Sequence, residues 1–312
     1  MQELAAPNAM PISIEEAIHR IPRWAGASSL AVTALPGGIT NLNYRVVVGG
    51  ESFVVRIAAP NAAQLGIDRQ REYHCTVAAS QTGIGPEVVY FLPDVDVLVT
   101  RFIDGRCPSV AEMVRPEMMQ RLVASMHRYR EGPVFEGSFS PFHALTHYRR
   151  VARDQGAPLP QDVGPMYRHL AEIEEALRRG RAVIQPCHND LWEPNLIDDG
   201  TVIHIVDWEY AGMGDVHFDL ANFAIHHDLT DPQDEELLHS HFGEVTDGGV
   251  ARLKLMRIVA ELREAMWCMV GMNVSSIAFD FLGYAAAHFA RYRRALDDRR
   301  LSQWLAQAVT GA

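Results

Sequence analysis

The most informative stretch of this sequence is Cys187-His188-Asn189-Asp190-Leu191-Trp192-Glu193-Pro194-Asn195. It contains the pattern H-x-D-L-x-x-x-N, which places an amide five residues after a carboxylate. In phosphoryl transfer, one carboxylate accepts or orients the proton of the attacking hydroxyl, and a nearby amide oxygen reaches a magnesium ion. The pattern therefore predicts Asp190 as the catalytic base and Asn195 as a ligand of Mg²⁺.

A second acidic position follows in His204-Ile205-Val206-Asp207-Trp208-Glu209-Tyr210. Two short apolar runs, 195–197 and 202–206, flank Asp198-Asp199-Gly200, and this is the signal of a hairpin. Such a hairpin would bring Asp207 to Asp190 and Asn195, where it would be a second ligand of the metal. A buried His–Asp pair alone is commonly structural, but the whole arrangement is typical of a kinase catalytic loop. We therefore predict a phosphotransferase.

The composition limits the class of protein. Hydrophobic residues make up 48% of the chain and charged residues 21%, which is typical of a soluble globular protein. The net charge of −11 disfavours nucleic acid or an anionic membrane surface as a partner. The four scattered cysteines, without a C-x-x-C pair, are expected to be reduced thiols. Without an apolar run of membrane-spanning length or a signal-peptide pattern, we expect a cytoplasmic protein. The oligomeric state stays open.

Lysine usage narrows the choice of nucleotide site. Lys254 is the only lysine, and it lies in a helical stretch far along the chain. A Walker A loop requires a Gly-Lys-Ser/Thr sequence, so this loop is excluded. The phosphate-binding lysine of an ordinary protein kinase is excluded for the same reason. Arginine or backbone groups must bind any nucleotide phosphates.

The N-terminal part has the pattern of an antiparallel sheet. Strands are expected at 31–35, 44–48, 52–57, 88–91 and 95–99, with one helix at 68–80. The loop Pro36-Gly37-Gly38-Ile39-Thr40-Asn41 joins the first two strands, and Ile39, Thr40 and Asn41 are candidates to cover the phosphates of ATP. Most Gly-Gly pairs are simply turns, so this loop alone is weak evidence.

Arg56 and Glu72 are the expected phosphate-binding pair. Arg56 lies within Phe53-Val54-Val55-Arg56-Ile57, where a charge could belong to an edge strand facing water. A guanidinium group also suits phosphate oxygens, and Glu72 on the following helix could orient it. A solvent-exposed helix carboxylate is the simpler explanation of Glu72. The following crossing, Thr100 to Gly105, would place backbone groups of Thr100 and Phe102 at the adenine edge.

The rest of the chain has mainly helical patterns, so the expected fold is α+β, with two lobes at residues 1–101 and 102–312. Asp219 is expected to open a helix and to accept backbone N–H bonds from the catalytic loop. Roles for Asp215, Glu209 and residues 131–164 are not assigned. A long helix is expected at 249–270, where Glu264 and Trp267 are neighbours beside an apolar stripe. Packing of Trp267 and solvation of Glu264 are the simpler explanation, but the pair could also bind an alkylammonium group.

Together these residues resemble the choline/ethanolamine kinase family, within the aminoglycoside-phosphotransferase-like small-molecule kinases, which have a protein-kinase-like fold. The matching segments are 37–41, 54–57, 188–195, 205–212, 218–222, 275–281 and Tyr284. The resemblance implies ATP and Mg²⁺ as cofactors, with Asp190 as base, Asn195 and Asp207 as metal ligands, and Arg56 with Glu72 at the phosphates. It also implies phosphoryl transfer to the hydroxyl of a small amino alcohol.

The acceptor pocket is expected to contain Trp192, Glu264, Trp267 and Tyr284, of which Trp267 and Tyr284 match aromatic positions of the choline pocket. Eukaryotic choline kinases have a second tryptophan where this chain has Glu264. The pocket is therefore expected to be less aromatic and more acidic, which leaves room for ethanolamine or another primary amine. The alternatives are an aminoglycoside or other small-hydroxyl kinase, and a catalytically inactive nucleotide-binding module.

Overall fold

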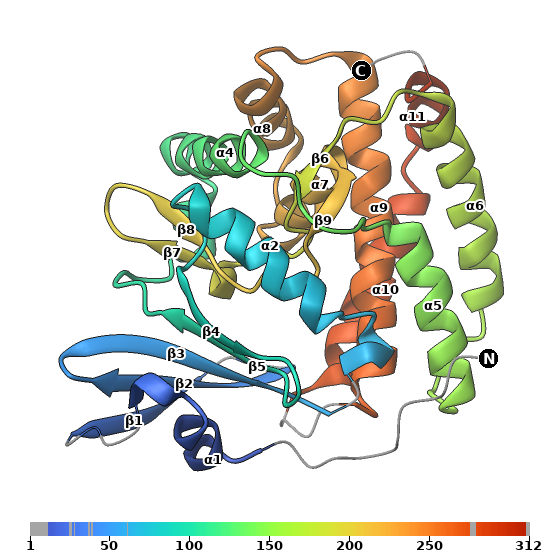
Figure 1. The fold of residues 1–312 in the computed structure, drawn as a ribbon. Helices are drawn as coiled ribbons and strands as arrows, with labels where there is room; N and C mark the ends of the chain where they lie inside the picture. Colours follow the sequence, from blue (N-terminus) through green and yellow to red (C-terminus); the bar gives the residue numbers. More distant parts are fainter. Residues whose placement is uncertain are drawn as a thin grey trace.

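An antiparallel sheet of five strands forms the N-terminal part of the molecule in the computed structural model, which describes residues 12–24, 27, 29–36, 38, 40–60, 62–274 and 279–309 (Figure 1). The strands lie in the order β1-β2-β3-β5-β4. Their bounds are β1 Leu30–Leu35, β2 Asn41–Val48, β3 Glu51–Ala58, β4 Val88–Leu92 and β5 Val97–Arg101. The expected five-stranded sheet is confirmed. Its second strand begins earlier than expected, because Asn41 already pairs with Ala58.

The two faces of β3 have different partners. Side chains of a strand alternate between the faces of its sheet. Phe53, Val55 and Ile57 accordingly join a small apolar core with α1 (Ile14–His19), whereas Val54 and Arg56 face a cavity on the other side. Because β3 lies between β2 and β5, Arg56 is not on an edge strand. The position of Arg56 between two core residues therefore directs its guanidinium group into the cavity.

Helices form most of the remaining chain, as expected (Figure 1). Helix α2 (Arg69–Gln81) begins at Asp68, whose side chain accepts hydrogen bonds from the N–H groups of Gln70 and Arg71. The helices that follow are α3 Val110–Met113, α4 Pro116–Arg130, α5 Pro141–Asp154, α6 Val163–Arg179, α7 Val216–His226, α8 Asp231–Phe242, α9 Asp247–Gly271, α10 Phe281–Leu296 and α11 Leu301–Gln307. Three 3₁₀ turns complete these elements, η1 Pro22–Trp24, η2 Ala62–Leu65 and η3 Glu193–Asn195.

Helix α9 lies at the centre of the helical part. It packs against α5, α7, α10 and α11, and most of its side chains are buried. The hydroxyl of Thr246 accepts a hydrogen bond from the N–H of Gly249 at 3.0 Å, which caps the start of the helix. Arg263, Glu264 and Trp267 are carried on this helix, so its packing fixes them in place.

Two small antiparallel pairs of strands surround the catalytic loop. Strands β7 (Leu196–Asp198) and β8 (Ile203–Ile205) form the expected hairpin, with Gly200 at φ +92° in its turn. Strands β6 (Ile184–Cys187) and β9 (Gly212–Asp215) pair beside it. The crossing from the sheet approaches the hairpin closely, since a Cβ atom on Gly105 would lie 2.6 Å from Ile197. Glycine is therefore needed at this position.

The start of α7 differs from the expectation. Asp219 does not open this helix; Asp215 is its N-cap, and its carboxylate accepts a hydrogen bond from the N–H of His217 at 3.0 Å. The prediction was wrong because the helix already begins at Val216, three residues before Asp219. The lobe boundary at residues 101 and 102 stays a prediction, although it coincides with the end of β5. Within the described residues, no helix combines the length and apolar character that crossing a membrane requires.

Candidate active site

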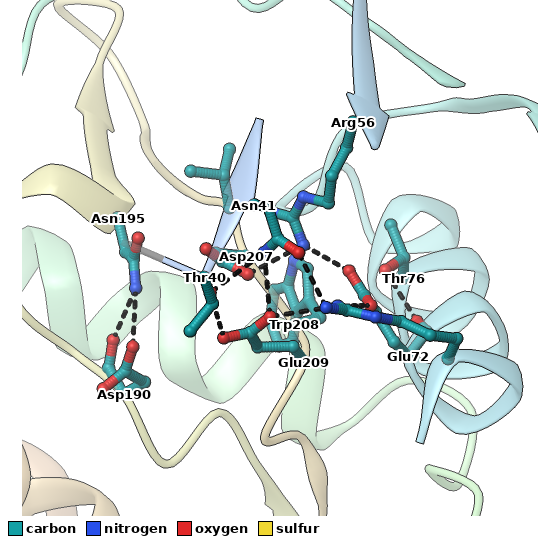
Figure 2. Close-up of polar contacts among 12 residues, drawn as sticks. Thr40, Asn41, Arg56, Glu72, Thr76, Asp190, Asn195, Asp207, Trp208 and Glu209 are labelled. Atoms are coloured by element: carbon teal, nitrogen blue, oxygen red, sulfur yellow. Dashed lines mark hydrogen bonds and ion pairs between the residues drawn. The ribbon is translucent and has the colours of Figure 1, made fainter. Parts of the chain in front are cut away.

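The catalytic loop and the hairpin bring Asp190 and Asn195 into direct contact. The amide nitrogen of Asn195 donates to the carboxylate of Asp190 at 3.1 Å and to its carbonyl at 2.9 Å. Figure 2 shows this nitrogen directed at Asp190 and the amide oxygen of Asn195 on the opposite side. The oxygen of Asn195 is therefore directed away from Asp190, as a metal ligand would require.

Asp219 fixes the backbone of the catalytic loop. Its carboxylate is fully buried and accepts hydrogen bonds from the N–H groups of His188 and Asn189 at 3.2 and 2.7 Å. The guanidinium group of Arg130 binds the same carboxylate at 2.8 Å. Asn189 has φ +67°, a strained conformation for a residue other than glycine. The expected bonding of Asp219 to the loop is thus present, and it stabilises a strained turn directly before Asp190.

Asp207 follows the hairpin and faces Arg56. Its backbone also has a φ of +67°, and its carboxylate lies 2.8 Å from the guanidinium group of Arg56. The N–H of Val206, the preceding residue, donates to the carbonyl of Asn195 at 2.9 Å. The hairpin thereby ties the position of Asp207 to that of Asn195.

Arg56 also forms the expected ion pair with Glu72 on α2 (Figure 2). Glu72 is buried, so the alternative of a solvent-exposed carboxylate is wrong. A second arginine, Arg69, binds the other oxygen of Glu72 at 2.6 Å. Sequence reasoning did not assign Arg69 a role, although its spacing of three residues from Glu72 on one helix was a usable signal.

Glu209 links the hairpin to the sheet. Its carboxylate accepts hydrogen bonds from Thr40 and Asn41 at 3.0 and 2.9 Å, and it lies 3.0 Å from Arg69. Thr40 and Asn41, the expected phosphate-covering residues, therefore have side chains bound to protein groups here (Figure 2). Glu209 is a residue whose role the sequence did not indicate, because it connects segments that are distant along the chain.

The negative charge of this site favours a cation. Burial raises the pKa of Asp190 to about 8. The positive charge of Arg263 opposes this increase, and neighbouring carboxylates add to it. Burial raises the pKa of Asp207 to about 7, against the opposing charge of Arg56. Mg²⁺ prefers oxygen ligands, usually a few carboxylates together with phosphates. The carboxylate of Asp207 and the amide oxygen of Asn195 are therefore ligand types that fit Mg²⁺.

One cavity of about 400 Å³ collects most of the predicted site residues, a volume suited to small ligands. The predicted residues that line it are Thr40, Arg56, Thr100, Phe102, Asp190, Trp192, Asn195, Asp207, Glu264, Trp267 and Tyr284. Asn41 and Glu72 do not line it, but they bind residues that do. Ile39 lies outside the described residues. The cavity therefore unites the proposed nucleotide and acceptor groups.

The crossing after β5, where we expected the adenine edge, lines this cavity. Thr100 is buried within β5, and Phe102 follows the strand. The N–H of Phe102 already donates to the carbonyl of Ser52 at 3.0 Å. The carbonyl of Phe102 is thus left for a ligand, but its N–H is not. One face of the Phe102 ring is covered by Arg45, whose guanidinium carbon lies 4.2 Å from the ring centre.

The part of the cavity where we expected the acceptor, around Glu264 and Trp267, carries less net negative charge than the sequence suggested. Arg263 binds Glu264 directly and reaches Asp190 at 3.3 Å. Burial opposes ionisation of Glu264, but the charge of Arg263 outweighs it and lowers the pKa of Glu264. Arg263 thus offsets the negative charge that Glu264 was expected to bring to this part of the cavity. Helical periodicity could have revealed this arginine, since it lies among apolar residues of α9.

Aromatic groups complete the acceptor side. The indole N–H of Trp267 donates to the hydroxyl of Tyr210 at 2.8 Å, and the guanidinium carbon of Arg263 lies 4.4 Å from the Tyr210 ring centre. The ring of His226 lies 6.1 Å from that of Trp192. His226 was not predicted, because no motif marks it. Trp267 is thus bonded through its N–H while its ring lines the cavity, which is compatible with both packing and ligand binding.

Residues 31–254 of the chain match the phosphotransferase enzyme family. The chain belongs to this family. The matched segment begins in β1 and ends within α9, so it includes the sheet, the catalytic loop and the hairpin. The general prediction of a kinase-type phosphotransferase is therefore supported by family membership as well as by the cavity.

Relatives of this phosphotransferase cover most of its length. A solved structure of a choline/ethanolamine kinase family protein from Mesorhizobium loti is 28% identical, with a TM-score of 0.81, covering 95% of this chain and 99% of the other. Protein LicA of Haemophilus influenzae is 25% identical over 75% of this chain and 71% of its own. The solved choline kinase LicA from Streptococcus pneumoniae, at 19% identity and TM-score 0.77, covers 90% and 98% of the two chains and shares the fold. The resemblance to choline/ethanolamine kinases is confirmed.

Proposed function

We propose that this phosphotransferase transfers the γ-phosphoryl group of ATP to the hydroxyl of choline or a related amino alcohol. One observation carries the proposal: Asp190, Asn195 and Asp207 line the same cavity as the aromatic rings of Trp267 and Tyr284. Aromatic faces bind alkylammonium groups, and the three polar residues are the types that phosphoryl transfer requires. The acceptor's hydroxyl and its ammonium group thus both find suitable partners.

In this proposal each polar residue has a separate task. Asp190 accepts the proton of the acceptor hydroxyl as its oxygen attacks the γ-phosphorus, and the bond from that phosphorus to ADP breaks. Asn195 and Asp207 would hold Mg²⁺, and the bound ion would neutralise charge at the phosphates. Arg56 is oriented by Glu72 toward the same phosphates. Asp219 holds the loop that carries Asp190.

The raised pKa of Asp190 suits a base that works near neutral pH, because a base is most effective when its pKa is close to the working pH. Arg263 contacts Asp190 and so helps to keep its carboxylate in one orientation. The volume of the cavity suits a small-molecule acceptor. Cytoplasmic ATP would be the phosphoryl donor.

The test is ATP consumption with choline, ethanolamine and an aminoglycoside as separate acceptors, with Asp190→Asn as the blank. We expect turnover with an amino alcohol and a loss of about 100- to 10,000-fold in the variant. Turnover with the aminoglycoside alone would support a phosphotransferase but would contradict an amino alcohol as its acceptor. No turnover with any acceptor, together with tight nucleotide binding, would instead support an inactive nucleotide-binding module.

A further inference from the structure

Three acceptor atoms converge on the acceptor side of the cavity. Asp190, His226 and Glu264 each contribute one ligand atom, and these atoms all lie within 4.8 Å of one another. Nε2 of His226 lies 3.9 Å from a carboxylate oxygen of Glu264. The side chain of His226 is 7% exposed, yet Nε2 has no hydrogen-bond partner among the described residues. A buried polar atom without a partner is costly, and because His226 lines the cavity a ligand there can supply one.

The charge of the group determines which cation it suits. Arg263 contacts both Glu264 and Asp190, so its positive charge balances one of the two carboxylates. Burial lowers the pKa of His226 to about 3, and the imidazole is therefore neutral at physiological pH. The group then carries at most one net negative charge. This balance suits a singly charged ammonium better than a divalent metal ion.

The spacing also suits an ammonium that retains hydrogen atoms. An ammonium that donates two hydrogen bonds of ~2.9 Å in tetrahedral directions holds its acceptors about 4.7 Å apart, and the 3.9 Å between Nε2 of His226 and Glu264 requires a narrower angle between the two bonds. A neutral imidazole with its proton on Nδ1 accepts at Nε2, and each carboxylate oxygen can accept more than one hydrogen bond. An N–H of the acceptor can therefore bond to His226, a second can bond to Glu264, and the hydroxyl of the same molecule remains near Asp190.

We propose that His226 determines acceptor specificity, because its unpartnered Nε2 beside Glu264 accepts a hydrogen bond from a primary or secondary ammonium. This inference rests on the proposed amino-alcohol kinase function. A quaternary ammonium has no N–H, so it leaves Nε2 without a partner and places methyl groups against it. The rings of Trp267 and Tyr284 bind either kind of cation, and they do not discriminate in this way. The chain thus prefers ethanolamine-type acceptors to choline.

The test compares ethanolamine with choline in the wild type and in His226→Phe. The phenyl ring retains the approximate shape and removes the acceptor nitrogen. For each acceptor we would measure kcat/KM in the complete reaction and Kd by calorimetry with the nucleotide-free protein. A hydrogen bond to a charged group corresponds to about a 10- to 100-fold difference in affinity. We expect the wild type to favour ethanolamine, and His226→Phe to reduce the ethanolamine-to-choline ratio by about tenfold or more.

Two further variants separate hydrogen bonding from folding. His226→Gln keeps an acceptor oxygen and should retain part of the preference. His227→Phe makes the same change one residue later, where the imidazole does not line the cavity and its Nδ1 bonds to the carbonyl of Phe223. It should leave the ratio unchanged. Mono- and dimethylated ethanolamine, which keep two and one N–H groups, should fall between the two end members.

The outcomes distinguish this inference from the proposed function. If both acceptors are phosphorylated and His226→Phe leaves their ratio unaltered, the specificity role is refuted while the kinase function stands. A wild-type preference for choline would also refute it. If neither acceptor binds or is phosphorylated, the proposed function fails, and the role of His226 fails with it.

Discussion

The carboxylate of Glu209 accepts a hydrogen bond from the hydroxyl of Thr40 at 3.0 Å, across 169 positions of the chain. This contact joins the loop that precedes β2 to the segment that follows the catalytic hairpin. Both groups are buried, so water does not compete for the bond. Glu209 therefore couples the position of the loop that we expect to cover the nucleotide to that of Asp207, two residues before Glu209.

Glu209→Ala should weaken both nucleotide binding and stability. The change leaves Thr40, Asn41 and Arg69 without their shared partner, and each unsatisfied buried group costs about 1–3 kcal/mol. We expect KM for ATP to rise about tenfold or more, and the melting temperature to fall. Glu244→Ala is the matched control, because Glu244 is exposed. An unchanged KM for ATP in Glu209→Ala would show that this contact does not position the loop.

The two carboxylates with raised pKa values should make the metal-free protein less stable as the pH rises. Asp190 and Asp207 ionise near 3.8 when unfolded, and at about 8 and about 7 when folded. Between these values the folded chain retains protons that the unfolded chain has lost, so the free energy of unfolding decreases with increasing pH. The decrease should begin near pH 4 and end above about pH 8.

Asp190→Asn should remove part of this pH dependence. Thermal unfolding without Mg²⁺ should give similar melting temperatures for variant and wild type at pH 4, and a higher melting temperature for the variant at pH 8. Asp199→Asn should show the opposite sign at pH 8, because N–H groups of Val202 and Thr201 lower the pKa of Asp199 to about 2. A lower melting temperature for Asp190→Asn at pH 8 would contradict the raised pKa.

Arg56→Lys should impair ATP binding despite conservation of charge. Arg56 contacts Glu72 and Asp207 with a planar group, and a lysine ammonium cannot reproduce this arrangement. We expect KM for ATP to rise about tenfold, with a smaller change in KM for the acceptor. Arg179→Lys on the exposed surface of α6 serves as the control. Equal changes in both Michaelis constants would argue against a role specific to the phosphates.

Asp219→Asn should destabilise the fold more than the same substitution at any exposed aspartate. It removes the charge that Arg130 neutralises in a fully buried position, and breaking such a pair costs about 3–5 kcal/mol. Asp228→Asn, which breaks an exposed pair with Arg291, should cost less than about 1 kcal/mol. Urea denaturation of both variants measures the difference. Similar midpoints would mean that Asp219 is dispensable for holding the loop.

The sequence predicted those parts of the structure that depend on local patterns. The hairpin between Asn195 and Asp207 follows from two apolar runs around an Asp-Gly turn, and the strand that carries Arg56 follows from the apolar run 53–57. The helix start at Asp215 was missed because several residues could have capped α7. Boundaries of this kind depend on which cap the tertiary structure selects.

The remaining parts of the site depend on contacts between distant segments. Glu209 meets Thr40 across 169 positions of the chain, and Arg263 on α9 meets Asp190 across 73, so tertiary packing alone brings each pair together. The left-handed backbone of Asn189 and Asp207 likewise was not predicted, although Asn and Asp adopt it more readily than other residues apart from glycine. For this reason the sequence indicated the catalytic residues but not the charge balance of the pocket.

The alternation along β3 constrains how this protein can change over evolution. Val55 and Ile57 belong to the apolar core, and Arg56 between them faces the cavity. Insertion or deletion of a single residue in this strand would exchange its faces, burying the arginine in the core and exposing the valine side to ligand. Insertions and deletions should therefore be tolerated in the Gly49-Gly50 turn, which adjoins open space. Selection should remove them from the strand itself.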